Sequence, residues 1–216
     1  MGIILEVQPA RPDLDRWLAD PQIRVFHRRQ SAATTQQLWD AAQELRLSQT
    51  RVLGRLIRWR IPGVPANASF DELFANPPFT VLERTEDSLV SGLVGKIWTL
   101  RRDYPEVDPD GFLEWTTSGT AKVLFANWVQ AADSGEAAES GEAAESGRPA
   151  HSRQAADSGH PADSAPAVLH SETRVRAYGP QGRIGLASLR PLVRAFEQLI
   201  GSDALAAAVR QAERRR

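Results

Sequence analysis

The chain contains no cysteine. This absence excludes disulfides, thiol catalysis and cysteine-ligated metal sites. Apolar runs are short, and none approaches the roughly 18 residues that a membrane-spanning helix needs. The amino-terminal stretch over 1–17 has neither a basic start nor a long apolar segment, so it is not typical of a secretory signal. We therefore expect a cytoplasmic protein without a membrane span.

Lysine is nearly absent. Of the 26 basic residues only two, Lys96 and Lys122, are lysines, and the others are arginines. The formal net charge is −1, which gives no general attraction to nucleic acid or to a membrane surface. The arginines over 51–58 and 210–216 have no interleaved aromatic residues, so nucleic-acid binding is not predicted. The length of 216 residues allows one or two domains, and the apolar content is sufficient for a core.

Large apolar side chains are missing altogether from residues 131–166. The tract repeats itself, since GEAAES occurs at 135–140 and again at 141–146. Without apolar side chains to bury, it cannot offset a backbone entropy cost of roughly 1–2 kcal/mol per residue. We predict a disordered loop. The alternative is an acidic tether for a basic partner, because acidic residues outnumber basic ones here.

The remaining chain alternates between strand and helix patterns. Thr34 with Gln37, and Ser69 with Glu72, have the spacing of capping boxes and predict two helix starts. From the amino terminus the expected elements are an extended lead-in over 1–20, a strand over 23–30, helices over 31–45 and 48–60, a short turn near 70–74, a hairpin of strands 79–87 and 89–100, a turn-rich loop over 103–111, strands over 112–130 and 168–178, and a helix from Ser188.

The terminal helix has a clear apolar stripe and a break at Gly201. The strands on either side of the tract are expected to pair, because loop closure costs only about 0.6 kcal/mol for each doubling of loop length. The sequence therefore predicts a lead-in over 1–20 and a single domain over 21–216, interrupted by the loop at 131–166.

This order of elements resembles the helix-grip fold of the SRPBCC (START-like) superfamily, in a bacterial-type branch that carries a low-complexity insertion. The segments that carry the resemblance are LVSGLVGKIW (89–98), FLEW (112–115), GTAKVLF (119–125) and LHSETRV (169–175). The resemblance implies an α+β fold with two short helices after the first strand. In it a curved antiparallel β-sheet wraps around a long C-terminal α-helix, with an apolar cavity between them.

The resemblance also implies a function, the binding of a lipid, sterol-like or polyketide-like hydrophobic small molecule in that cavity. One alternative is an enzyme of the polyketide cyclase/dehydrase type that uses polar residues of the same cavity, and whether any catalysis occurs is left open. The other is an interaction protein that uses the acidic loop, although no motif specifies a protein partner. The candidate cavity-lining residues are Val25, His27, Leu93, Ile97, Val123, Phe125, Asn127, Val129, Leu169, Ser171, Thr173, Val175, Leu192 and Phe196.

Motifs for metal and phosphate chemistry are weak, and no cofactor is predicted. Two of the four histidines, His151 and His160, lie in the tract, and the other two, His27 and His170, have no clustered carboxylates at ligand spacing. The acidic stretch over 103–111 lacks the spacing of a calcium loop, and GLVGK (92–96) lacks that of a phosphate-binding loop. The charged strand residues Lys96, Lys122, Glu172 and Arg174 are expected on a solvated outer face of the sheet.

Overall fold

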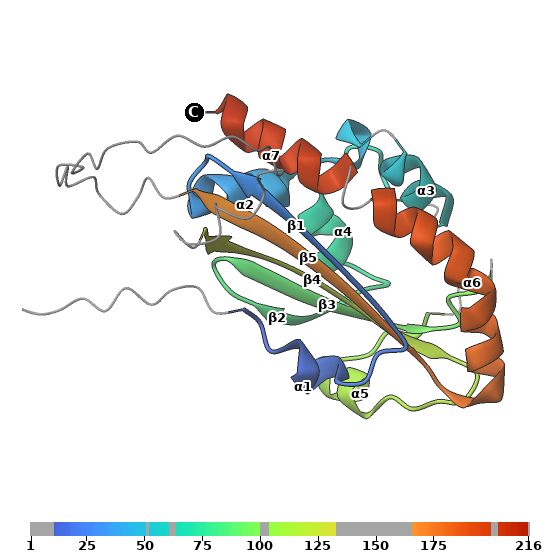
Figure 1. Ribbon diagram of the computed structural model, residues 1–216. Helices are drawn as coiled ribbons and strands as arrows, with labels where there is room; N and C mark the ends of the chain where they lie inside the picture. The colour runs from blue at the N-terminus through green and yellow to red at the C-terminus, as the bar shows by residue number, and fades with distance from the viewer. Residues whose placement is uncertain are drawn as a thin grey trace, which may run out of the picture.

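Five antiparallel strands form one sheet in the order β1-β5-β4-β3-β2 in the computed structural model (Figure 1). The structure describes residues 11–50, 52–60, 64–99, 104–132, 166–199 and 203–215. Its elements are α1 (Leu14–Leu18), β1 (Ile23–Ser31), α2 (Thr35–Glu44), the 3-10 turn η1 (Leu47–Gln49), α3 (Leu53–Arg60), α4 (Phe70–Ala75), β2 (Thr80–Arg84), β3 (Ser88–Gly95), α5 (Pro109–Glu114), β4 (Ala121–Ala131), β5 (Ala167–Ala177), α6 (Gly179–Leu199) and α7 (Leu205–Arg214). The predicted α+β class with an antiparallel sheet is confirmed.

The two strands that flank the low-complexity tract are neighbours in the sheet. β4 pairs with β5 from Ala121 opposite Ala177 to Ala131 opposite Ala167, so the expected pairing is confirmed. The backbone N–H of Ala132 also donates to the carbonyl oxygen of Pro166 at 2.7 Å. The tract therefore connects the two strands of a hairpin. Disorder is predicted for residues 131–166. The prediction is wrong at the ends, because Ala131 is paired in β4 and Ala132 is hydrogen-bonded to Pro166, while residues 133–165 lie outside the described residues.

Helices cover both faces of the sheet (Figure 1). On the first face, strand residues such as Val123 and Val129 form one core with α2, α4 and α7. On the second face, Leu124 and Trp128 form another core with α1 and α5. None of the helices that the structure describes is long and apolar enough to cross a membrane.

Both predicted capping boxes are present. The side chain of Thr34 accepts from the N–H of Gln37 at 3.2 Å, and the side chain of Gln37 accepts from the N–H of Thr34 at 3.1 Å. At the start of α4, the side chain of Ser69 accepts from the N–H of Glu72, and the side chain of Glu72 accepts from the N–H of Ser69. These local bonds fix where α2 and α4 begin, and hence which of their faces meet the sheet.

The expectation of an extended lead-in is wrong for residues 14–18, which form α1. Asp13 caps this helix, because its Oδ1 accepts from the N–H groups of Asp15 and Arg16, both at 3.2 Å. Trp17 and two leucines of α1 are buried against the second face. A helix of five residues is too short to show a helical period in the sequence, which is why the pattern missed it.

The turn-rich loop expected over 103–111 and the strand expected from 112 are also corrected. Residues 109–114 form α5, with the carboxylate of Asp108 accepting from the N–H of Gly111 at 2.7 Å. Phe112 of the FLEW segment is fully buried in the second core, and β4 begins only at Ala121. Pro109 at the first helical position favours the helix, since its missing N–H has no partner there.

The long helix α6 begins at Gly179 rather than at the predicted cap Ser188, whose hydroxyl donates to the carbonyl oxygen of Gly185 inside the helix. Glycines in this first half weaken the helical signal. They are required by close packing, because a Cβ at Gly185 would collide with the Trp98 ring. The break expected at Gly201 lies outside the described residues, and a separate helix, α7, follows it.

The predicted solvated outer face is a further correction. Lys122, Glu172 and Arg174 are only 4%, 1% and 3% exposed. Their alternation with apolar residues is that of a half-exposed strand, but α1 and α5 cover this face. Lys96 alone of the four is exposed, just after β3 ends.

Candidate functional site

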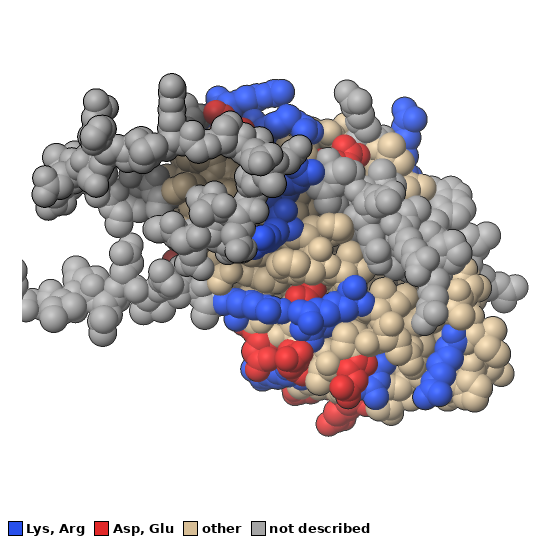
Figure 2. Space-filling view, viewed as in Figure 1, with Lys and Arg blue, Asp and Glu red and all other residues tan. Residues whose placement is uncertain are grey.

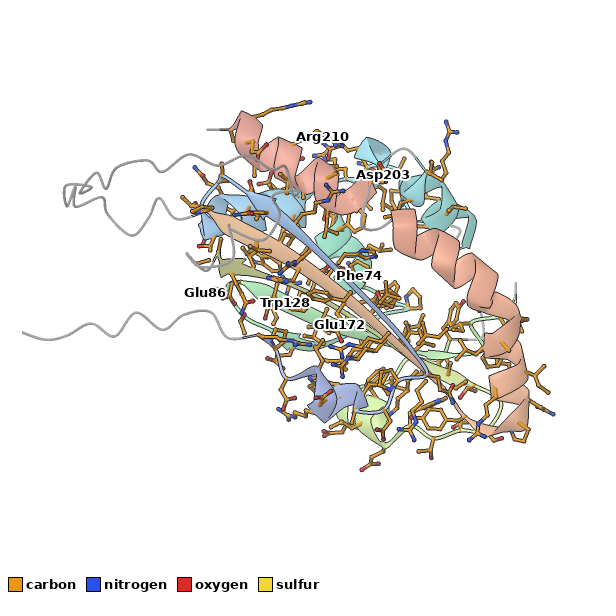
Figure 3. All side chains as sticks on the ribbon, viewed as in Figure 1. Phe74, Glu86, Trp128, Glu172, Asp203 and Arg210 are labelled. Atoms are coloured by element: carbon orange, nitrogen blue, oxygen red, sulfur yellow. The ribbon has the colours of Figure 1, made fainter. Side chains whose placement is uncertain are left out.

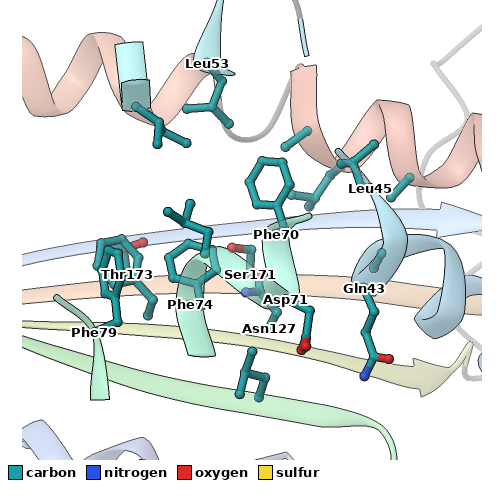
Figure 4. A pocket seen from close by; sticks show the side chains of 18 of the residues that line it. Gln43, Leu45, Leu53, Phe70, Asp71, Phe74, Phe79, Asn127, Ser171 and Thr173 are labelled. Atoms are coloured by element: carbon teal, nitrogen blue, oxygen red, sulfur yellow. The ribbon is translucent and has the colours of Figure 1, made fainter. Parts of the chain in front are cut away.

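A cavity of about 280 Å³ lies on the first face of the sheet, beneath helices α2, α3, α4 and α7 (Figure 4). Three cross-strand neighbours, Val25, Thr173 and Phe125, form part of its floor on β1, β5 and β4. Leu53 of α3 and Leu205 of α7 contribute to the opposite wall. The lining is predominantly apolar, which is the usual composition of small-molecule sites.

Four phenylalanines form one wall of the cavity. Phe74 of α4 is at their centre, with ring centroids 6.2 Å from Phe70, 5.2 Å from Phe79 and 5.1 Å from Phe125. Phe79 and Phe125 meet edge to face at 5.5 Å. Aromatic pairs in these geometries stabilise one another by about 0.5–1.5 kcal/mol beyond their burial, so the four rings support one another in this wall.

Three neutral polar side chains interrupt the apolar floor (Figure 4). Asn127 of β4 lies directly opposite Ser171 of β5, and Thr173 is the next residue on the same face of β5. Among the described residues, none is a hydrogen-bond partner of these three side chains. Neighbouring Ser91 differs, since its hydroxyl donates to the carbonyl oxygen of Phe74 at 2.8 Å. The cavity therefore contains donors and acceptors that are available to a ligand.

Ionisable groups are few among the described lining residues, which include only Asp71 and Tyr104. The carboxylate of Asp71 accepts a hydrogen bond from Arg84 at 2.8 Å, so its charge is already paired. Gln43 of α2 adds a neutral amide (Figure 4). The cavity is thus suited to a ligand without net charge.

Most of the sequence-predicted residues are brought together here. Those that line the cavity are Val25, Leu93, Ile97, Val123, Phe125, Asn127, Leu169, Ser171, Thr173 and Val175. Val129 is fully buried in the first core and does not line it. His27 does not line it either, although its Nε2 is buried and has no hydrogen-bond partner among the described residues. The side chains of Leu192 and Phe196 lie outside the described residues.

Sequence reasoning missed the helical half of the cavity. Trp39 of α2, Ile57 of α3, Phe74 of α4 and Ala208 of α7 all line it. The available signal was the apolar stripe of each helix, because a stripe that faces a sheet is the part of a helix that can line a pocket. The stripes do not say which helix covers which part of the sheet.

A second polar cluster lies on the other face of the sheet (Figure 3). Glu172, whose side chain is 0% exposed, accepts from Arg11 at 2.9 Å, from Arg24 at 2.7 Å and from Arg174 at 2.6 Å. Burial alone would raise the pKa of Glu172, but the hydrogen bonds from Arg24 and Arg174 outweigh it and hold the pKa below its ordinary value. Arg174 also pairs with Asp15 at 2.5 Å. The charged side chains of the cluster pair with one another. Because Asp15 belongs to α1 and Arg174 to β5, these ion pairs link α1 to the sheet.

Lys122 occupies the same face nearer to α5. Its Nζ donates to the carbonyl oxygen of Leu113 at 2.7 Å and lies 5.2 Å and 5.9 Å from the ring centroids of Phe112 and Tyr178. Burial, with a smaller contribution from Arg176, lowers the pKa of Lys122 to about 8. The amine is directed at a backbone carbonyl and aromatic rings rather than at a cavity, which is a structural role.

Over the part of the chain that the structure describes, no three His, Asp or Glu side chains are grouped so that they could hold a metal ion. No protein-family model matches the chain, and neither a curated protein nor a solved structure matches it. Membership of the SRPBCC superfamily therefore stays a prediction.

Proposed function

We propose that this protein binds a hydrophobic small molecule in the cavity on the first face of the sheet. The observation that carries the proposal is the combination of an apolar lining with three polar side chains, Asn127, Ser171 and Thr173, that have no partner among the described residues. Ser171 is buried and Asn127 and Thr173 are half-buried, and polar groups in such positions normally have hydrogen-bond partners in the protein or in water. A ligand that supplies the missing partners explains why polar residues are placed here.

The size and chemistry of the cavity restrict the ligand. Its volume of about 280 Å³ is close to the lower end of the roughly 300–1,000 Å³ that is typical of ligand sites. Asn127 offers both a donor and an acceptor, as do the two hydroxyl groups. The matching ligand is a compact ring system or short chain with a neutral hydroxyl, carbonyl or amide group at one end.

The helix-grip architecture is part of the same proposal. It is supported by the order of elements, in which β1 is followed by α2 and α3, then by antiparallel strands, and finally by helices. In this chain it is the short helix α7 that supplies Leu205 and Ala208 to the cavity, with Ala204 just before it. The described part of α6 packs at the end of β5 (Figure 1).

The alternative of a cyclase or dehydrase has less support. Such an enzyme needs a proton donor or acceptor that reaches the ligand. The ionisable residues among the described lining are Asp71, which is paired with Arg84, and the phenol Tyr104, and His27 does not line the cavity. The third possibility, an interaction through the acidic tract, concerns residues outside those the structure describes.

A matched pair of ligands tests the proposal. We expect 1-naphthol to bind more tightly than naphthalene by about two- to tenfold, because one net hydrogen bond contributes about 0.5–1.5 kcal/mol. In the triple variant Asn127→Leu, Ser171→Ala and Thr173→Val, the two ligands should bind alike. Native mass spectrometry of protein purified from its own source should also show a bound neutral molecule. If neither aromatic binds and the spectrum shows only the protein, the proposal is wrong.

A further inference from the structure

Polar side chains of the cavity floor belong to one row that crosses the sheet. Arg84 of β2 lies opposite Leu89 of β3, and Leu89 lies opposite Asn127 of β4. Asn127 in turn lies opposite Ser171 of β5. Because directly opposite residues of an antiparallel pair point to the same face, all four side chains belong to the first face. The row therefore carries a guanidinium at its outer end, and an amide and a hydroxyl nearer to the middle of the sheet.

This row marks one end of the cavity. On β4, Asn127 and Phe125 line the cavity, whereas Val129, two positions beyond Asn127, does not. In the next row inward, the hydroxyl of Thr173 opposite Phe125 is the one polar lining group among the described residues. Figure 4 shows the same division, with Asn127 towards one end of the cavity and Phe79 towards the other. The cavity thus has a polar end and an aromatic end.

Two helices add polar side chains to the polar end. Asp71 of α4 pairs with Arg84, whose Nη2 lies 2.8 Å from Oδ1 of Asp71. This ion pair brings Asp71 to the polar row and leaves its other oxygen, Oδ2, without a hydrogen-bond partner among the described residues. Gln43 of α2 also lines the cavity, and its amide has no partner in the described part of the chain. In Figure 4 both side chains lie on the side of Asn127, away from Phe79.

Three acceptor oxygens are therefore available at the polar end. Oδ2 of Asp71 can only accept, and the amides of Asn127 and Gln43 each contribute a carbonyl oxygen. A single ligand hydroxyl has one proton and can donate to only one of these acceptors. A hydrogen bond to a carboxylate is roughly twice as strong as one between neutral groups, so the first donor belongs at Asp71. A second donor next to the first serves the amides.

We propose that the ligand is an apolar chain or ring whose head carries two adjacent uncharged hydrogen-bond donors, of which a vicinal diol is the simplest form. One hydroxyl donates to Oδ2 of Asp71 and the other to the amide of Asn127, while the diol oxygens accept from Ser171 and the amide N–H groups. The apolar tail lies along the phenylalanine wall. Asp71 is thus the residue that selects the head group. The inference rests on the proposed function, to which it adds the second donor and the residue that recognises it.

Two other kinds of ligand fit the polar end less well. A carboxylate head, as in a fatty acid, places a negative charge beside the carboxylate of Asp71, whose partner Arg84 is already engaged. A ligand with hydroxyl groups at its two ends brings only one of them to the polar end, and the other meets the aromatic end, where Thr173 offers a neutral partner. Both are outcomes of the test.

The test compares two isomers, 1,2-octanediol and 1,8-octanediol, which have the same hydroxyl groups in different positions. Isothermal titration calorimetry with the full chain measures both affinities. We expect the 1,2-isomer to bind at least about tenfold more tightly. In Asp71→Asn this preference should fall below about threefold, because the charge that strengthens one hydrogen bond is lost. Gln43→Leu gives an independent check and should reduce the preference by about threefold.

Asp20→Asn is the matched control. Asp20 forms an exposed ion pair with Arg176, as Asp71 does with Arg84, but on the second face of the sheet. Figure 2 shows acidic and basic side chains next to one another over α1, the helix that precedes Asp20. This variant changes an aspartate of the same kind away from the cavity, so it should leave the preference for 1,2-octanediol unchanged.

The outcomes separate this inference from the proposed function. Equal affinity of the two isomers, or a preference that Asp71→Asn leaves unchanged, would overturn the inference and leave the hydrophobic site in place. Tighter binding of octanoate than of 1,2-octanediol would do the same, because it would show that the head is anionic. If 1-octanol and both diols fail to bind, the proposed function is wrong and the inference falls with it.

Discussion

Arg174 and Glu172 lie two residues apart on the same face of β5, and the Nε of Arg174 donates to Oε1 of Glu172 at 2.6 Å. Both side chains are almost completely buried. The same carboxylate also accepts from Arg11 and Arg24. One buried carboxylate therefore links the segment before α1, strand β1 and strand β5.

Replacing this carboxylate should destabilise the protein strongly. Glu172→Gln keeps the shape but leaves the buried guanidinium of Arg174 with only the exposed carboxylate of Asp15 as a counter-charge, and removing one partner of a buried pair costs about 3–5 kcal/mol. Urea denaturation measures the change in the free energy of unfolding. Glu44→Gln is the matched control, because Glu44 forms its ion pair with Arg215 at the surface and its loss should matter little. A loss below about 1 kcal/mol for Glu172→Gln would contradict the prediction.

Acid should remove the stabilisation that the Glu172 carboxylate provides. The pKa of Glu172 in the folded protein lies below its ordinary value of 4.5, so the unfolded chain binds more protons in that window. The stabilisation is complete above pH 4.5 and is lost as the pH falls through the folded pKa. We expect the difference in unfolding free energy between the natural protein and Glu172→Gln to shrink between about pH 6 and pH 3. A constant difference over that range would show that Glu172 does not titrate as expected.

Lys122 should produce a pH dependence of the same sign at alkaline pH. Its pKa falls from 10.5 to about 8 on folding, so between these values the unfolded chain again binds more protons. The cost of burying the charged amine is present below pH 8 and disappears as the pH rises toward 10.5. Relative to Lys122→Met, the natural protein should gain on the order of 1–3 kcal/mol between about pH 7 and pH 10, since one pKa unit corresponds to about 1.36 kcal/mol. Parallel stability curves for the two proteins would refute this.

The strands and the faces of their side chains could be predicted from the sequence, because strand geometry is local. Alternation places Val123, Phe125 and Asn127 on one face of β4 whatever the rest of the chain does, because the side-chain period of a strand is two. The pairing of β4 with β5 followed from the low entropic cost of a long loop. Strand alternation and strand pairing together therefore predict which face forms the floor, but not where along the strands the cavity ends, since Val129 and His27 do not line it.

The covering elements do not follow from such local patterns. Whether Glu172 and Arg174 meet water or protein depends on α1 and α5, which are too short to show a period and lie next to prolines. The roof of the cavity depends on which helix stripe meets which strand, and tertiary packing decides that. The glycines of α6, such as Gly185, weaken its helical signal because Trp98 needs their space.

A similar close approach on the second face gives a packing prediction. A Cβ at Gly92 would lie 2.5 Å from Cε2 of the Phe112 ring, which is fully buried. Gly92→Ala should therefore cost about 1–3 kcal/mol through overpacking. Phe112→Leu frees space, so the double variant should lose less stability than the sum of the two single variants. Strict additivity in denaturation experiments would mean that the two side chains do not compete.

The unpartnered hydroxyl of Thr173 leads to a prediction about stability and function together. Thr173→Val removes a polar group that no described residue satisfies, so the free energy of unfolding without ligand should stay unchanged or rise by up to about 1 kcal/mol. The control is Thr120→Val. The hydroxyl of Thr120 accepts from Trp115 at 2.9 Å and donates to the carbonyl oxygen of Thr117 at 2.6 Å, so its loss should cost about 1–3 kcal/mol. If Thr173→Val is destabilised as much as Thr120→Val, the hydroxyl serves the fold and not a ligand. If instead it is neutral in stability while the preference for 1-naphthol over naphthalene falls, the polar floor of the cavity is maintained for binding.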